Sequence, residues 1–273
     1  MESLQLIARG RTAEVYAWGT DQVLKLFYPH FSREVVEFEQ GKAQAVVAAG
    51  VNTPAVGEIV ELEGRTGLVY QRVEAHSMLL EIMRRPWAAR RLATQMAELQ
   101  VAMHACTAPN LPPLRRQLER KINGATPLPD PLRRAALEAL AKLPEDTAVC
   151  HGDFHPDNIL MTSQGPLIID WVDASSGHPM GDVARTTLLT VKGTLPPGNP
   201  MAPLLNLLRR DFYRTYIRRY FSLSPYTPEQ VQVWLPVVAA GRLDEGINEE
   251  QENLIRMVEQ GLAATKDSPL ETA

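Results

Sequence analysis

The chain has 273 residues, of which 45% are hydrophobic and 22% are charged, with a formal net charge of −4. This composition is typical of a folded globular protein and excludes a collagen-like, low-complexity or mainly disordered chain. The mildly acidic balance gives no reason to expect a nucleic-acid partner, and the length favours two lobes over one compact body.

The cysteine content and the apolar runs bear on where the protein acts. Two cysteines, Cys106 and Cys150, are too few for a disulfide framework, and this suits a reducing cytoplasm. No run approaches the roughly 18 apolar residues that span a bilayer, so we expect no membrane partner. The first six residues lack the basic and apolar regions of a secretory signal. The expectation is a cytoplasmic protein.

The N-terminal part is expected to consist of strands and a single helix. Residues 1–27 alternate apolar and polar side chains and read as short strands. A helix follows over 33–49, and Gly50 closes it. Two further strands are expected around 56–62 and 66–71. The first 75 residues therefore predict the order β-β-β-α-β-β.

The remainder of the chain is predicted to be mainly helical. Leu92, Met96, Leu99 and Met103 recur at the spacing of one helix face. We therefore expect an α+β protein with two lobes. Their predicted ranges are 1–75 for the β-rich lobe and 76–273 for the helical lobe.

One polar loop carries the most specific signal. Residues 151–160 read HGDFHPDNIL, and residues 168–171 read IIDW. The spacing H-x-D-x-x-x-x-N is that of a kinase catalytic loop. Phosphoryl transfer needs metal-bridged phosphates and a positioned hydroxyl. Asp153 is the candidate catalytic base for that hydroxyl, and Asn158 and Asp170 offer the hard oxygen ligands that suit Mg²⁺.

These stretches, together with VDASSGHPMGDVA at 172–184, resemble the aminoglycoside phosphotransferase and choline kinase-like family. The resemblance implies a bilobal protein-kinase-like fold. It also implies a small-molecule kinase that moves the γ-phosphoryl group of ATP, with Mg²⁺, to an alcohol group. By the same resemblance Asp153 matches the catalytic aspartate and Asn158 and Asp170 match the metal ligands. Asp182 matches an aspartate that braces the loop.

The resemblance extends to the nucleotide site of the N-terminal lobe. Lys25, on the third predicted strand, matches the lysine that binds the α- and β-phosphates. Its partner should be a glutamate of the following helix; Glu39 is favoured and Glu37 is the alternative. Gly10 is the only glycine where the family has a glycine-rich loop. The resemblance places the adenine edge against backbone groups near Gln71 and Val73.

Several acidic residues are candidates for the acceptor site. Asp173 follows Asp170 by three residues, and the segment 244–260 carries an excess of acids. In the resembled family, acidic C-terminal helices receive amine-bearing substrates, a role that Asp244, Glu245 and Glu249 could take. Exposed helix charge and local capping explain these residues equally well.

Two other functions stay open at this point. A kinase-like protein that binds a nucleotide or metabolite without chemistry would explain the glycine-poor loop. Alternatively, His151, Asp153 and His155 alternate, so a strand would put them on one face as a zinc site of a hydrolase. The acceptor also stays open among aminoglycosides, choline-like amines, sugars, amino-acid alcohols and macrolides, as does the choice between ATP and GTP.

Overall fold

The computed structural model describes residues 4–192 and 202–267. The chain forms two compact units, and they confirm the predicted α+β fold. The β-rich unit combines Met1–Arg84 with Pro156–Val172, and the helical unit combines Arg85–His155 with Asp173–Ala273. Among the described residues, no helix is both long enough and apolar enough to cross a membrane.

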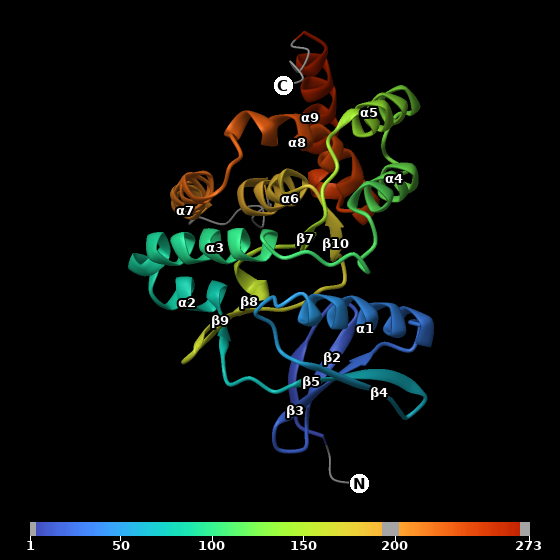
Figure 1. Ribbon diagram of the computed structural model, residues 1–273, viewed down its shortest axis with the longest axis vertical. Helices are drawn as coiled ribbons and strands as arrows, with labels where there is room; N and C mark the ends of the chain where they lie inside the picture. Colours follow the sequence, from blue (N-terminus) through green and yellow to red (C-terminus); the bar gives the residue numbers. More distant parts are fainter. Residues whose placement is uncertain (1–3, 193–201, 268–273) are drawn as a thin grey trace. The chain divides into compact units, whose positions relative to one another are not determined.

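The β-rich unit is built on a five-stranded antiparallel sheet (Figure 1). Its order is β1-β2-β3-β5-β4. Short turns join β1 to β2, β2 to β3 and β4 to β5, and a helix connects β3 to the edge strand β4. Gly19 and Gly64 lie at two of these turns with φ of 66° and 72°, which favours glycine because it lacks a Cβ. The strands are β1 (Leu6–Arg9), β2 (Ala13–Trp18), β3 (Gln22–Phe27), β4 (Val56–Leu62) and β5 (Arg65–Gln71).

Helix α1 (Arg33–Ala48) covers one face of this sheet and contacts β4 and β5. Its buried Val36 packs in one cluster with Phe27 and Leu68 of the strands. The chain leaves the helix through Gly50, whose φ of 83° only glycine adopts easily. The observed helix agrees with the predicted range of 33–49.

A second, three-stranded sheet makes the units differ from the lobes expected at 1–75 and 76–273. Strand β6 (His76–Ser77) pairs with β8 (Ile159–Thr162), and β8 pairs with β9 (Gly165–Ile168). These pairings join Pro156–Val172 to the β-rich unit. Helix α2 (Met78–Arg84) and the short helix η2 (Pro156–Asn158) complete this part.

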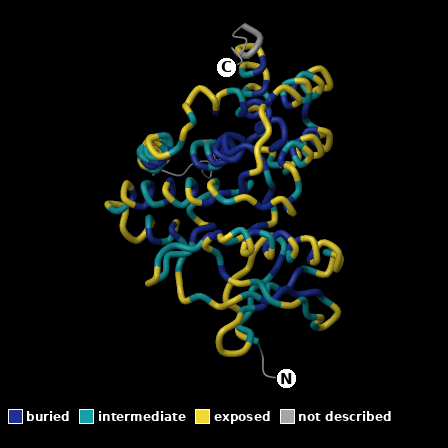
Figure 2. Tube along the Cα trace, in the orientation of Figure 1, coloured by how far each residue is buried: buried dark blue, intermediate teal, exposed yellow. Residues whose placement is uncertain are grey.

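The helical unit has its core around α6 and α8, the most deeply buried helices in Figure 2. Strands β7 and β10 pair antiparallel beside them, and β7 leads into the loop at 151–155. The predicted face of α3 is buried at Leu92, Met96 and Met103. The elements are η1 (Pro86–Ala88), α3 (Ala89–His104), α4 (Leu114–Gly124), α5 (Asp130–Lys142), β7 (Ala148–Cys150), β10 (Ser175–Gly177), α6 (Pro179–Lys192), α7 (Ala202–Leu223), α8 (Pro228–Arg242), η3 (Leu243–Glu245) and α9 (Asn248–Asp267).

Candidate active site

In the β-rich unit, Lys25 is the centre of a charged cluster. Because side chains alternate along a strand, Lys25 shares the face of Phe27, on the side of the sheet that α1 covers. Its Nζ donates to Glu39 Oε1 at 2.6 Å and lies 3.4 Å from Asp170 Oδ1. Burial lowers the pKa of Lys25, but the charges of Asp170 and Glu39 raise it by more than burial lowers it. The net shift of this pKa is therefore upward. The side chain is therefore held as an ammonium group.

The partner of Lys25 is Glu39 and not Glu37. Glu39 is buried, and it also accepts a hydrogen bond from Tyr70 Oη at 3.2 Å. Burial, followed by the charge of Glu39, raises the pKa of Tyr70 well above its ordinary value, so the hydroxyl stays a donor. Glu37 is exposed and pairs with Arg33 at 2.9 Å.

The predicted metal ligands lie at the same end of the β8–β9 hairpin. The register pairs Ile159 with Ile168, and Ile169 N donates to Asn158 O at 3.0 Å. Asp170 follows directly and has a φ of 68°, which costs a non-glycine residue roughly 1 kcal/mol or more. An amide and a carboxylate oxygen donor at one hairpin end fit the preference of Mg²⁺ for oxygen ligands.

Contacts of the two residues that follow Asp170 hold this segment in place. Trp171 Nε1 donates to Thr53 Oγ1 at 2.9 Å, and the buried Lys42 of α1 donates to Val172 O. Lys42 and Glu39 lie three residues apart on α1, so one helix contacts both Lys25 and the segment that carries Asp170. The strained residue is therefore over-determined by its neighbours, as is typical of functional positions.

In the helical unit, Asp153 lies between the side chains of Arg185 and His155. Arg185 Nη2 donates to Asp153 Oδ1 at 3.2 Å, and His155 Nε2 lies 3.3 Å from Oδ2. Burial raises the pKa of Asp153, but the hydrogen bond from His155 and the charge of Arg185 lower it more. Asp153 is therefore ionised at neutral pH and can accept a hydrogen bond from a hydroxyl group.

Gly152 fixes the loop that carries Asp153. Its φ is 79°, and a Cβ at this position would lie 2.5 Å from Asp173 O, so no other residue fits. Its N–H donates to Asp182 Oδ1 at 2.7 Å, and its carbonyl accepts from Arg185 Nε at 2.9 Å. Two residues of α6 thus hold the loop through its backbone.

Asp182 belongs to a buried polar network. Its Oδ2 accepts hydrogen bonds from Gln100 Nε2 at 2.9 Å and from His104 Nε2 at 3.0 Å. His104 also contacts Tyr220 Oη at 2.7 Å. This network is the physical basis of the bracing role expected for Asp182 from the resemblance.

The zinc-site alternative gains no geometric support. His151 is buried, and its Nδ1 accepts a hydrogen bond from Asp153 N at 3.1 Å. Within residues 4–192 and 202–267, no three histidine, cysteine, aspartate or glutamate side chains are arranged to hold a metal ion. His151 is thus engaged in shaping the loop.

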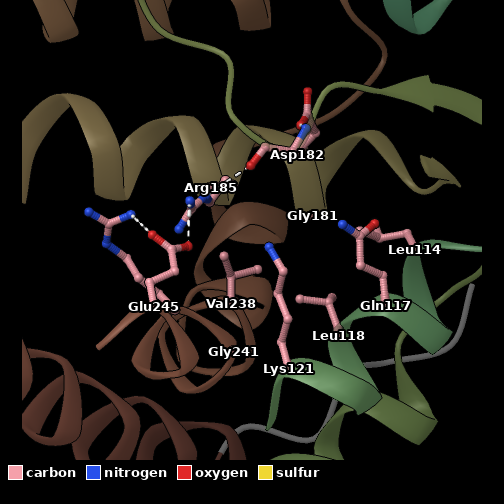
Figure 3. A pocket seen from close by; sticks show the side chains of 12 residues that line it. Leu114, Gln117, Leu118, Lys121, Gly181, Asp182, Arg185, Val238, Gly241 and Glu245 are labelled. Atoms are coloured by element: carbon pink, nitrogen blue, oxygen red, sulfur yellow. Dashed lines mark hydrogen bonds and ion pairs between the residues drawn. The ribbon is translucent and has the colours of Figure 1, made fainter. Parts of the chain in front are cut away.

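An open pocket lies in the helical unit beside Gly152 (Figure 3). Two of the acidic acceptor-site candidates belong to this region. Glu245 lines the pocket and pairs with Arg185 at 2.6 Å, and Asp173 pairs with Lys121, another lining residue, at 2.8 Å. Burial raises the pKa of Asp173, but the charge of Lys121 lowers it more. The exposed Asp244 and Glu249 are not lining residues.

The remaining predicted nucleotide residues lie in the β-rich unit. Gly10 is exposed, and its N–H donates to Ala13 O at 2.8 Å in the turn between β1 and β2. Gln71 ends β5, and Val73 lies two residues beyond it. Their roles toward a nucleotide rest on the sequence.

Four residues of these clusters were not predicted as site residues: Tyr70, Gln117, Lys121 and Arg185. Tyr70 carried a usable signal, because it lies on β5 two residues from Leu68, which pairs with Lys25, and so on the same face of the sheet. The others lie on helices whose packing partners come from distant segments. No local pattern marks them.

Comparisons with known proteins agree with the motifs. The model of the phosphotransferase enzyme family matches residues 3–231. A comparison with curated proteins finds no match.

Among solved structures, the chain is similar in fold to three kinases. A choline/ethanolamine kinase family protein from Mesorhizobium loti has 19% identity and a TM-score of 0.58, covering 98% of this chain and 88% of that one. An aminoglycoside phosphotransferase in complex with ADP and hygromycin B has 16% identity and a TM-score of 0.62, covering 99% and 95%. An amicoumacin kinase has 14% identity and a TM-score of 0.64, covering 99% and 91%.

The structural similarity at these identities supports the protein-kinase-like fold, and the family match spans most of the chain. The family inferred from the motif at 151–184 is thereby confirmed. The chain belongs to the phosphotransferase enzyme family.

Proposed function

We propose that the protein transfers the γ-phosphoryl group of ATP, as its Mg²⁺ complex, to a hydroxyl group of a small molecule in the cytoplasm. The observation that carries the proposal is the contact of Lys25 with both Glu39 and Asp170. Through this contact Lys25, the proposed phosphate-binding cation, lies beside Asp170, the proposed metal ligand, which is 145 residues further along the chain. Two of the structural relatives were solved with ADP or AMP-PNP, which supports a nucleotide as the donor here.

Each group has a defined role in the proposed reaction. Lys25 binds the α- and β-phosphates as a compact cation, and Glu39 and Tyr70 orient it. Asn158 and Asp170 hold Mg²⁺, which supplies positive charge to the β- and γ-phosphates. Asp153, of the helical unit, accepts the proton of the attacking hydroxyl. In a loose transition state that proton leaves late, so a carboxylate of low pKa suffices.

The first test is nucleotide binding by the Asp170→Ala variant. A ligand at about 100 times its Kd stabilises the folded protein by roughly 2.7 kcal/mol, which moves Tm by several degrees. We expect ATP with Mg²⁺ to raise the Tm of the wild type in this way. In Asp170→Ala the Mg²⁺-dependent part of the shift is lost.

A matched control is Glu58→Ala, which removes an exposed acid of β4 in the same unit. It should keep the full shift. A Mg²⁺-dependent shift that persists in Asp170→Ala would show that Asp170 does not hold the metal. Nucleotide binding without turnover on any hydroxyl acceptor would favour a non-catalytic binding protein.

Arg185 is expected to act as a positioning residue for Asp153. Hydrogen bonds to charged groups contribute about 1.5–3 kcal/mol, so Arg185→Met should lower kcat by roughly tenfold or more with little change in KM for ATP. Loss of the cation also raises the pKa of Asp153 toward the ordinary aspartate value of about 4. The acid limb of the pH profile of kcat therefore moves upward in pH.

The conservative variant separates positioning from folding. Arg185→Lys keeps the charge and should restore part of the acid limb position, although it loses the two-point contact with Gly152 O and Asp153. An Arg185→Met enzyme with less folded protein but an unshifted pH profile would contradict the positioning role.

A further inference from the structure

The pocket beside Gly152 holds a buried oxygen that lacks a partner. Gln117, on α4, lines the pocket, and its Nε2 donates to both Asp173 O at 3.2 Å and Asp173 Oδ1 at 3.0 Å. These two contacts fix the amide orientation, because the opposite orientation would place its oxygen against two other oxygens. Gln117 Oε1 is buried and accepts no hydrogen bond from the described residues. A ligand group that donates a hydrogen bond would satisfy it.

Each charged side chain that lines the pocket already has a hydrogen-bond or ion-pair partner in the helical unit. Three cations line it, and each has an acidic partner: Lys121 pairs with Asp173 at 2.8 Å. Arg185 lies between Asp153 and Glu245. Arg242 pairs with Glu245 at 3.1 Å and with Glu250 at 2.6 Å.

These pairs decide what charge the pocket accepts. Two acids line the pocket: Asp182 accepts three hydrogen bonds within the fold, and Glu245 lies between two arginines. Figure 3 shows Lys121 extending from α4 into the pocket, where it would repel a cationic ligand. A carboxylate ligand would meet Lys121 and Arg185 already paired with acids. Burial of a charge without a partner is costly, so neither a cation nor an anion is favoured.

Apolar residues also line the pocket. Leu114, Leu118 and Val238 form an apolar wall. Sugar-like molecules combine apolar C–H faces with hydroxyl groups that donate hydrogen bonds, and the pocket offers a surface for each.

We propose that the phosphoryl acceptor is an uncharged polyhydroxylated molecule, bound at this pocket through Gln117. This inference rests on the proposed function and selects one acceptor class for it. Gln117 is then a specificity residue that accepts a hydrogen bond from a hydroxyl group, and Lys121 is one that disfavours amines.

The test compares acceptors that differ only in charge. Neutral hexoses, pentoses and inositols are assayed for phosphorylation with Mg-ATP beside amino sugars and uronic acids of the same scaffolds. We expect the highest kcat/KM with a neutral member, at least tenfold above its amino and acid counterparts. A preference for an amino sugar, an aminoglycoside or a uronic acid would overturn the proposal.

Two variants connect the preference to the pocket. Gln117→Met removes the accepting oxygen and should lower kcat/KM for the neutral acceptor by roughly tenfold, the equivalent of one hydrogen bond. Lys121→Gln should shift the ratio of amino to neutral acceptor by roughly tenfold in favour of the amine. The control is Arg120→Gln on the exposed side of the same helix, which should change neither value.

Failure of this inference differs from failure of the proposed function. If Mg-ATP binds in an Asp170-dependent manner but no neutral polyol is phosphorylated, the acceptor class is wrong and the nucleotide site stands. If Mg-ATP does not bind, the proposed function falls, and this inference falls with it. Unchanged kinetics in Gln117→Met would also overturn the assignment of the pocket.

Discussion

Replacement of Asp153 with asparagine is expected to lower kcat by roughly 10²- to 10⁴-fold, the usual contribution of a positioned general base. Asparagine keeps the size and one oxygen of the side chain, so the contact with Arg185 Nη2 can persist. It cannot take the proton of the attacking hydroxyl. Mg-ATP binding should be unaffected, because the proposed nucleotide and metal ligands belong to the β-rich unit.

The pH dependence gives a second readout for Asp153. Burial raises its pKa, but His155 and Arg185 lower it more, so the folded-state pKa lies below the ordinary value of 3.8. The carboxylate is therefore present throughout the neutral range and is lost only when the pH falls through that depressed pKa. We expect no limb of the pH–rate profile between pH 5 and 8 to come from Asp153.

Turnover should be measured beside Mg-ATP binding, with Asp130→Asn as the matched control in the helical unit. Asp130 is exposed in the first turn of α5, so its variant should behave as the wild type. An Asp153→Asn enzyme that retains more than a tenth of wild-type kcat would contradict the role of base.

The phase of α1 decides the partner of Lys25. Val36, Ala43 and Val46 are buried toward the sheet, and Glu39 lies at a helical spacing of three from Val36 and four from Ala43. Glu37 is offset from this face by one residue, or about 100° of helix rotation. The sequence favours Glu39 only through the family resemblance of this helix, because three of its other apolar residues, Val35, Phe38 and Val47, are exposed.

Residues 156–172 could not be assigned to a unit from the sequence, because the strand pairing that assigns them is only two residues long and joins distant segments. Strand β6 has two residues, and its pairing of His76 with Met161 joins segments far apart in the chain. A two-residue strand has no periodicity to detect. The sequence therefore predicts only a boundary between the lobes at residue 75, shortly after the end of β5.

The same reason explains why Arg185 and Lys121 were not predicted. Each lies on a helix, and each meets its acidic partner only after that helix has packed on the loops at 152–153 or 173. By contrast, the hairpin that carries Asn158 and Asp170 is local, and its register follows from a short turn. The sequence therefore predicts the candidate metal ligands, which lie on one hairpin, but not Arg185 and Lys121, which lower the pKa of nearby aspartates from distant helices.

The Asp182→Asn variant is expected to lose about 3 kcal/mol of unfolding free energy, because a buried hydrogen-bond donor is left without its charged acceptor. Asp182 is fully buried and accepts from three donors, through Oδ1 from Gly152 N and through Oδ2 from Gln100 and His104. Asparagine has one accepting oxygen. Either Gly152 N or the pair of Gln100 and His104 then faces the NH₂ group of the asparagine, which cannot accept a hydrogen bond.

The loss should depend on pH. Burial raises the pKa of Asp182, but the hydrogen bond from His104 leads the interactions that bring it below the ordinary 3.8. A group with a depressed folded-state pKa stabilises the protein above its unfolded-state pKa, and this contribution disappears as the pH falls through the folded-state value. The difference between wild type and Asp182→Asn should be full at pH 6 and shrink below pH 4.

Urea unfolding at several pH values measures this difference. The matched control is Asp211→Asn, because Asp211 pairs with Arg90 on the exposed surface, where ion pairs contribute little. If Asp182→Asn unfolds at the same urea concentration as Asp211→Asn, the buried network does not stabilise the fold. Because Asp182 also holds Gly152 N, turnover should fall even in conditions where Asp182→Asn is fully folded. A stable variant with wild-type turnover would show that the loop keeps its shape without this hydrogen bond.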